Sequence, residues 1–109
     1  MEINEANILI VDDEAVIREG CTRILEKEGH KVDSVENGME CLKKVQEKPY
    51  DLLLCDLMMP GMNGLEIIQE INKLELDINI IVITGYATVE TAVEAMKSGA
   101  YDYVPKPFT

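Results

Sequence analysis

The residues most able to do chemistry stand at or just beyond the ends of short apolar runs. These residues are Asp12, Asp13, Asp56, Thr84 and Lys106. If the runs form neighbouring parallel strands, the three carboxylates meet a hydroxyl and an ammonium group at one edge of the sheet. Like charges a few ångströms apart repel one another, so such a cluster calls for a cation. A few carboxylates with room for water favour Mg²⁺ over zinc or a closed calcium site.

The same side chains suit the transfer of a phosphoryl group to an aspartate. Asp56 would attack phosphorus as the nucleophile. Mg²⁺ and Lys106 would neutralise charge on the equatorial oxygens, and Thr84 would donate a hydrogen bond. Taken singly, these residues have ordinary explanations, because aspartates after strands often form turns and lysines are usually solvated. Their joint placement at four strand ends favours the chemical interpretation.

Strand-length apolar runs alternate with segments of helical spacing. The runs are residues 8–11, 32–35, 52–55, 80–83 and 101–104. Apolar side chains recur at helical spacing within residues 17–25, 38–47, 67–74 and 89–96. Asn37 and Asn63 each precede a glutamate by three residues, as helix caps do, and Gly29 and Gly99 stand where helices should end. The order predicts an α/β fold with a doubly wound, five-stranded parallel sheet.

Length and composition limit the classes of function. A chain of 109 residues is the length of one domain, so residues 1–109 are expected to form a single unit. The net charge of −11 opposes direct binding to nucleic acid or to an anionic membrane. No apolar run approaches the roughly 20 residues that span a bilayer. The first residues lack the pattern of a secretory signal, so a cytoplasmic protein is expected.

Four segments resemble the successive signature blocks of response regulator receiver domains of two-component systems. They are ILIVDDE, LLLCDLMMPGMNGLE, IIVITGYA and DYVPKPF, and the resemblance extends from about Ile8 to the end of the chain. It implies a flavodoxin-like sheet of order 2-1-3-4-5. It also implies a phosphorylation-activated signalling domain that catalyses only its own phosphorylation and dephosphorylation. The stretch ITGYATVETAVEAMKSGAYDYV is particularly similar to receivers of NtrC-type, sigma-54-dependent transcriptional activators.

The resemblance assigns a role to each acidic residue. Asp13 and Asp56 would ligate Mg²⁺ directly, Asp12 would act through water, and the backbone carbonyl of Met58 would supply a further ligand. The implied partner is a sensor histidine kinase that phosphorylates Asp56. An output domain beyond Thr109, with ATPase and DNA-binding parts, would carry the signal to transcription.

Two further expectations follow from the same resemblance. Thr84 and Tyr103 would form a switch pair, in which Thr84 moves toward the phosphoryl oxygen and Tyr103 rotates inward into the space that it leaves. A fifth helix normally follows the KPF segment, whereas this sequence ends at Thr109. We therefore expect apolar sheet surface beside the first helix to be uncovered, and a homodimer is one arrangement that would cover it.

Two other classes of protein compete with this interpretation. A haloacid-dehalogenase-like phosphatase also uses an aspartate and Mg²⁺, but its nucleophile normally follows the first strand, a position that Asp12 holds here. A flavin- or nucleotide-binding module shares the doubly wound fold. Neither a GxGxxG nor a GxxxxGK[ST] loop is present, and VDDE follows the first strand instead. The identity of the labelled aspartate would discriminate between a receiver and a phosphatase.

Overall fold

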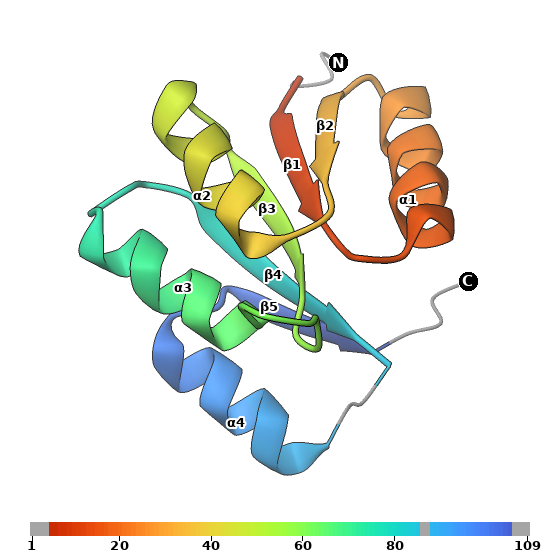
Figure 1. Ribbon diagram of the computed structural model, residues 1–109. Helices are drawn as coiled ribbons and strands as arrows, with labels where there is room; N and C mark the ends of the chain where they lie inside the picture. Colours follow the sequence, from red (N-terminus) through yellow and green to blue (C-terminus); the bar gives the residue numbers. More distant parts are fainter. Residues whose placement is uncertain (1–4, 86–87, 106–109) are drawn as a thin grey trace.

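The structure is a computed structural model, and it describes residues 5–85 and 88–105. Strands and helices alternate along these residues (Figure 1). The elements are β1 (Asn7–Val11), α1 (Ala15–Lys27), β2 (Lys31–Val35), α2 (Gly38–Glu47), β3 (Leu52–Asp56), α3 (Gly64–Lys73), β4 (Asn79–Thr84), α4 (Val89–Ser98) and β5 (Asp102–Pro105). No helix in the described ranges is long and apolar enough to cross a membrane.

The strands form one parallel sheet in the order β2-β1-β3-β4-β5. This confirms the predicted doubly wound fold and its strand order. The register places Val11 beside both Val35 and Cys55, and Thr84 beside Pro105. The carboxyl ends of β1, β3 and β4 therefore lie at the same edge, which is where ligands of such sheets bind.

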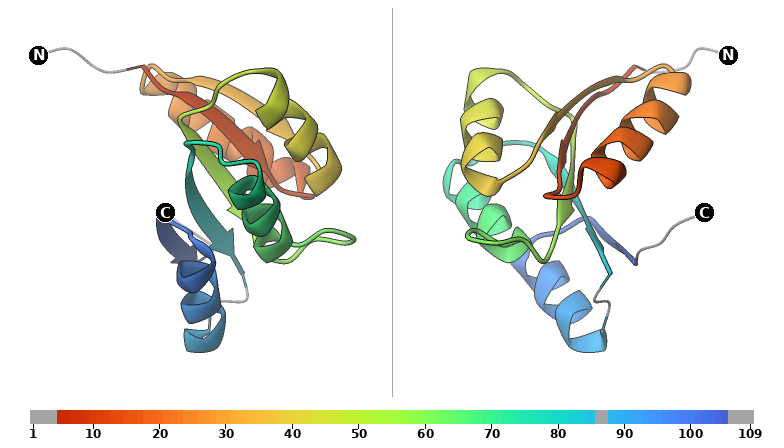
Figure 2. Two further views of the ribbon diagram at one scale, coloured as in Figure 1. Left: turned by 90° about the vertical axis from the view of Figure 1, so that its left-hand side faces the viewer. Right: turned by 45° about the vertical axis from the view of Figure 1, so that its right-hand side comes forward.

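Helices cover the two faces of the sheet unequally (Figure 2). Alternate residues of the central strands point to opposite faces. One set packs with α2, α3 and α4 in a large buried cluster that includes Leu9, Leu53 and Val82. The other set, which includes Ile8 and Ile10, packs with α1 in a smaller cluster. Because β1, β3 and β4 are buried on both faces, their sequences are continuous apolar runs.

An apolar groove lies beside α1, where no described helix covers the sheet. Its lining residues come from α1, β3, β4 and β5: Cys21, Ile24, Leu25, Leu54, Ile81, Ile83 and Val104. Ile24 belongs to the apolar stripe of α1, yet its side chain is 58% exposed because it borders this groove. The described residues thus confirm that apolar surface beside the first helix is uncovered.

Side-chain caps fix where three of the helices begin. Asn37 accepts a hydrogen bond from the backbone of Glu40, and Asn63 and Glu66 form a complete capping box, as predicted. Thr88 and Thr91 form a second box at α4, which the sequence analysis did not identify.

The apolar stripe of residues 89–96 correctly marks helix α4, but it does not mark the helix's buried side. Ala95 is the fully buried side chain, whereas Val89, Val93 and Met96 are exposed. A small residue suffices at the contact because α4 packs closely against its neighbours. The larger apolar side chains form an exposed surface on α4 instead.

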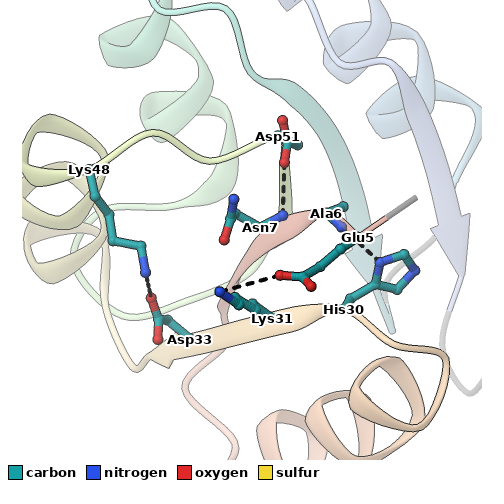
Figure 3. Close-up of polar contacts among 8 residues, drawn as sticks. All are labelled: Glu5, Ala6, Asn7, His30, Lys31, Asp33, Lys48 and Asp51. Atoms are coloured by element: carbon teal, nitrogen blue, oxygen red, sulfur yellow. Dashed lines mark hydrogen bonds and ion pairs between the residues drawn. The ribbon is translucent and has the colours of Figure 1, made fainter. Parts of the chain in front are cut away.

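Polar contacts tie the amino ends of the strands together, at the edge opposite the predicted site (Figure 3). The backbone N–H of Asn7 donates to Asp51 at 2.8 Å, and that of Ala6 donates to His30 Nδ1 at 3.1 Å. On β2, Asp33 contacts Lys48 at 2.9 Å. Asp33 also accepts a hydrogen bond from the Tyr50 hydroxyl. The Tyr50 hydrogen bond is the main cause of the lowered pKa of Asp33, followed by its bond with Lys48. These contacts fix the register of β1, β2 and β3.

The groove makes a testable difference between two adjacent isoleucines of β4. Ile80 is buried in the large cluster and Ile81 lines the open groove. We expect Ile80→Thr to lower the free energy of unfolding by about 2–3 kcal/mol, because it leaves a cavity and buries a hydroxyl. The same change at Ile81 should cost about 1 kcal/mol or less, and urea unfolding measures both. Equal losses would mean that the groove is covered in solution.

Candidate functional site

The carboxyl ends of β1, β3 and β4 bring three polar side chains into the interior. Asp12 follows β1, while Asp56 and Thr84 are the last residues of β3 and β4. The side chains of Asp12 and Thr84 are fully buried, and Asp56 is 3% exposed. Buried polar groups of this kind are costly unless they are paired or have a ligand, so they mark a candidate site.

Four carboxylates converge at this edge. One carboxylate oxygen from each of Asp12, Asp13, Glu14 and Asp56 lies within 4.8 Å of the others. We call these residues the acidic cluster. The structure brings together the three predicted aspartates and adds Glu14, which the sequence analysis did not identify. The uninterrupted run of acidic residues 12–14 was the signal for it.

The acidic cluster fits a hard divalent cation. Asp12 and Asp56 are buried, whereas Asp13 and Glu14 are exposed, so the cluster has one closed and one solvent-facing side. Oxygen donors with access to water are the environment that Mg²⁺ prefers, since it retains part of its hydration shell. The mutual repulsion of four carboxylates is also what a divalent charge would relieve.

Backbone contacts fix the orientation of the two buried aspartates. The N–H of Glu14 donates to Asp12 Oδ1 at 2.9 Å, and the N–H of Met58 donates to Asp56 Oδ1 at 3.2 Å. Met58 lies in the loop after β3, where its carbonyl was predicted to be a ligand; that role stays a prediction. Hydrogen bonds from backbone N–H groups stabilise the ionised form of a carboxylate.

Helix α3 starts directly against the end of β3. The N–H of Gly64 donates to the carbonyl of Leu57 at 3.0 Å. A Cβ atom at Gly64 would lie 2.7 Å from the backbone oxygen of Asp56 and 2.9 Å from Leu57 Cα. Only glycine allows this approach, because both contacts are with backbone that has no freedom to move aside. The contact fixes the backbone that carries Asp56.

The predicted switch residues lie on adjacent strands. Thr84 pairs in register with Pro105 of β5, and Lys106, the predicted cation, follows Pro105 but lies outside the described residues. Tyr103 is half-buried, and its ring packs against the large cluster. Its hydroxyl forms a 2.6 Å hydrogen bond with Thr91 Oγ1 of α4. Tyr103 therefore connects β5 to the start of α4.

The three cysteines, Cys21, Cys41 and Cys55, are free thiols and are buried. Burial raises the pKa of the Cys41 thiol to about 12, and burial is also the main cause of the raised pKa of Cys55. Cys55 directly precedes Asp56, but burial disfavours the thiolate form in which it would act as a nucleophile. Asp56 is thus the better candidate nucleophile at the end of β3.

Comparisons with known proteins agree with this geometry. The family model described as response regulator receiver domain matches residues 8–109. The transcriptional regulatory protein ZraR of Klebsiella oxytoca is 41% identical over 98% of this chain. The DNA-binding transcriptional regulator NtrC of Azospirillum brasilense is 39% identical over 97% of this chain. These relatives are similar to the chain as the sequence blocks indicated. The chain spans 24% and 22% of their respective lengths.

A solved structure shows the same architecture. The chemotaxis protein CheY4 of Vibrio cholerae superposes with a TM-score of 0.92 at 29% sequence identity. The match covers 97% of this chain and 90% of that one. None of these similarities favours a phosphatase or a nucleotide-binding module.

The contact at Gly64 gives a matched pair of variants. We expect Gly64→Ala to lower the free energy of unfolding by about 2 kcal/mol, because the new methyl group overlaps the backbone of Asp56 and Leu57. Gly20→Ala on α1 should instead stabilise the protein by about 0.5–1 kcal/mol, since its Cβ would have nothing within 4 Å. Urea unfolding measures both changes. If Gly64→Ala leaves the free energy of unfolding unchanged, the start of α3 does not pack tightly against the end of β3.

Proposed function

The chain belongs to the response regulator receiver domains, which are phosphorylation-activated signalling domains, and from this premise we propose that Asp56 is its phosphoacceptor. The phosphoryl donor would be a phosphohistidine of a sensor kinase. A carboxylate oxygen of Asp56 forms a bond to phosphorus while the bond from phosphorus to the donor breaks. The domain would catalyse this transfer and the later hydrolysis of its own phosphoaspartate, and no other reaction.

The observation that carries this proposal is the position of Asp56 in the acidic cluster. Its carboxylate is almost fully buried, yet it lies within 4.8 Å of the carboxylates of Asp12, Asp13 and Glu14. A structural role gives no reason to gather four like charges at a ligand-binding edge. A phosphoacceptor beside a cation site does give a reason for this arrangement.

Each residue would contribute a definite step. The backbone N–H of Met58 orients the Asp56 carboxylate for in-line attack. The hydroxyl of Thr84 donates to a phosphoryl oxygen, and the ammonium group of Lys106 neutralises charge on another. Asp12, Asp13 and Asp56, with the carbonyl of Met58, would hold Mg²⁺, and Glu14 is close enough to contribute. When bound, Mg²⁺ supplies positive charge against the phosphoryl oxygens.

We propose that Tyr103 transmits the signal to α4. Its hydroxyl bonds to Thr91 Oγ1, and the same oxygen accepts a hydrogen bond from the N–H of Thr88 and donates to the Thr88 carbonyl. Thr88 and Thr91 form the capping box of α4. When Thr84 moves toward the phosphoryl group and Tyr103 rotates inward, the bond to Thr91 breaks. The start of α4 then separates from β5, which biases a two-state equilibrium.

The wider roles follow from the same proposal. Residues 1–109 would form a receiver unit, and a further helix from chain beyond Thr109 would cover the apolar groove. In a longer protein, an output domain with ATPase and DNA-binding parts would convert the state of α4 into transcription regulation. We place this domain in the cytoplasm, where the kinase and the output domain would meet. Without the further helix, two copies of the groove would pair in a homodimer.

The identity of the phosphorylated aspartate tests the proposal. Incubation with acetyl phosphate and Mg²⁺ should add one phosphoryl group to the wild-type protein, detected by mass spectrometry. Asp56→Asn should abolish the label, because the amide is not a nucleophile. Asp77→Asn removes the same charge from an exposed site before β4 and should leave labelling unchanged. Labelling that survives in Asp56→Asn but is lost in Asp12→Asn would favour the phosphatase class.

Hydrogen exchange tests the link between Tyr103 and α4. The backbone N–H of Ala92 donates to the Thr88 carbonyl, so its exchange rate reports on the first turn of the helix. Tyr103→Phe removes one hydrogen bond and should speed this exchange about fivefold, as expected for about 1 kcal/mol. Beryllofluoride with Mg²⁺ should speed it in the wild type but little further in Tyr103→Phe. Tyr101→Phe, at an exposed tyrosine, is the matched control. Unchanged exchange in Tyr103→Phe would contradict the link.

A further inference from the structure

Arg18 makes a contact that the phosphoacceptor mechanism above does not use. It is the fourth residue of α1, and its Nη1 donates a 2.6 Å hydrogen bond to the backbone carbonyl of Asp12. Asp12 precedes the start of α1 and belongs to the acidic cluster. The side chain of Arg18 thus reaches back from the helix to the loop that presents Asp12 and Asp13.

We infer that Arg18 is a positioning residue for the metal site: it holds the loop of residues 12–14 so that its carboxylates converge with Asp56 before a cation binds. The inference rests on the proposed function, because it assumes that the acidic cluster holds Mg²⁺. It concerns the backbone of Asp12 and not a direct contact between Arg18 and the metal.

The contacts of Asp12 explain why a single side chain matters here. The N–H of Asp12 donates to the Val35 carbonyl at 3.3 Å, and Asp12 Oδ1 accepts from the N–H of Glu14 at 2.9 Å. The bond from Arg18 is shorter than both of these and comes from a charged donor, which makes it stronger than either. It fixes the peptide plane between Asp12 and Asp13, and therefore the direction in which both side chains leave the backbone.

The start of α1 is a second reason why the contact from Arg18 to Asp12 matters. The helix begins after Glu14, whose side chain makes no capping hydrogen bond, and its first turn contains no acidic residue. Helices α2, α3 and α4 all begin with a side-chain cap. At α1, the contact from Arg18 to Asp12 joins the helix to the preceding loop. A loop fixed in this way loses less conformational entropy when the metal binds.

The charge of Arg18 and its position act in opposite directions on metal affinity. A guanidinium group close to the acidic cluster repels a cation, so its charge alone would weaken Mg²⁺ binding. Its hydrogen bond arranges the ligands, so its position would strengthen Mg²⁺ binding. The sign of the change in affinity upon substitution therefore identifies which effect dominates. Our inference requires that position dominates.

The experiment compares three variants by calorimetric titration with Mg²⁺ at fixed ionic strength. Arg18→Met keeps the aliphatic part of the side chain and removes both charge and hydrogen bonds. Arg18→Lys keeps the charge, but its nitrogen is one atom nearer the backbone than Arg18 Nη1, so it does not reach the Asp12 carbonyl from the same position. Arg23→Met is the control, because Arg23 is on the same helix and lines the same surface pocket as Arg18, distinct from the apolar groove, but is exposed. Melting temperatures in EDTA report any loss of stability separately from metal binding.

We expect Arg18→Met to raise the dissociation constant for Mg²⁺ about tenfold, the size typical of groups that orient metal ligands. Arg18→Lys should weaken binding at least as much, because it keeps the repulsive charge without the geometry. Arg23→Met should bind Mg²⁺ as the wild type does. Melting in EDTA should show that the variants are folded, so that the change in affinity is not a loss of structure.

Other outcomes overturn the inference. Unchanged or tighter Mg²⁺ binding by Arg18→Met would show that Arg18 acts only through its charge or not at all. If Arg18→Met does not fold, wild-type affinity in Arg18→Lys would have the same meaning. Failure of the inference alone would leave wild-type Mg²⁺ binding and the labelling of Asp56 intact. Absence of Mg²⁺ binding or of Asp56 labelling in the wild type would overturn the proposed function as well.

Discussion

The repulsion among the carboxylates at the carboxyl ends of β1 and β3 is the constraint on which the rest of the structure depends. Left to themselves, four like charges within 4.8 Å would move apart. The parallel sheet prevents this, because buried strands fix where Asp12 and Asp56 leave the backbone. The start of α3 packs at Gly64 directly against the backbone at the end of β3. Arg18 donates a hydrogen bond to the loop after β1. The framework therefore keeps in place an arrangement that a bound cation would stabilise.

The convergence of the three predicted aspartates was easier to predict than the contacts that hold them in place. Asp12 and Asp13 follow β1 and Asp56 ends β3, so the strand order brings them together. The strands and helices were also predictable, since burial on both faces leaves continuous apolar runs and caps mark helix starts. The contact from Arg18 was not predictable, because it depends on where a long side chain folds back. The need for glycine at position 64 depends on a backbone approach that no sequence pattern reports.

Apolar surface that no described element covers appears in two places, on the sheet beside α1 and on α4, with different origins. The groove beside α1 exposes residues of β4 and β5, because α1 is the one helix on that face among the described residues. On α4, Val89, Val93 and Met96 are exposed because the helix makes its buried contact through Ala95. The apolar stripe of α4 predicted the helix but not its orientation. Hydrophobic periodicity identifies the buried side of a helix only when the largest apolar side chains are also the buried ones.

The two ends of α4 are held by different kinds of contact, and this difference sets how the helix can move. At its carboxyl end, Asn72 of α3 donates a 2.7 Å hydrogen bond to the Ser98 carbonyl, and Gly99 packs against the same side chain. At its amino end, the hydroxyl of Tyr103 bonds to Thr91. Asn72 lies far from the acidic cluster along α3, so phosphorylation has no direct means of releasing it. Tyr103 pairs with Val82 in β4, the strand that carries Thr84. In the proposed switch, a change at Thr84 would reach the amino end first, and α4 would pivot about its contact with Asn72.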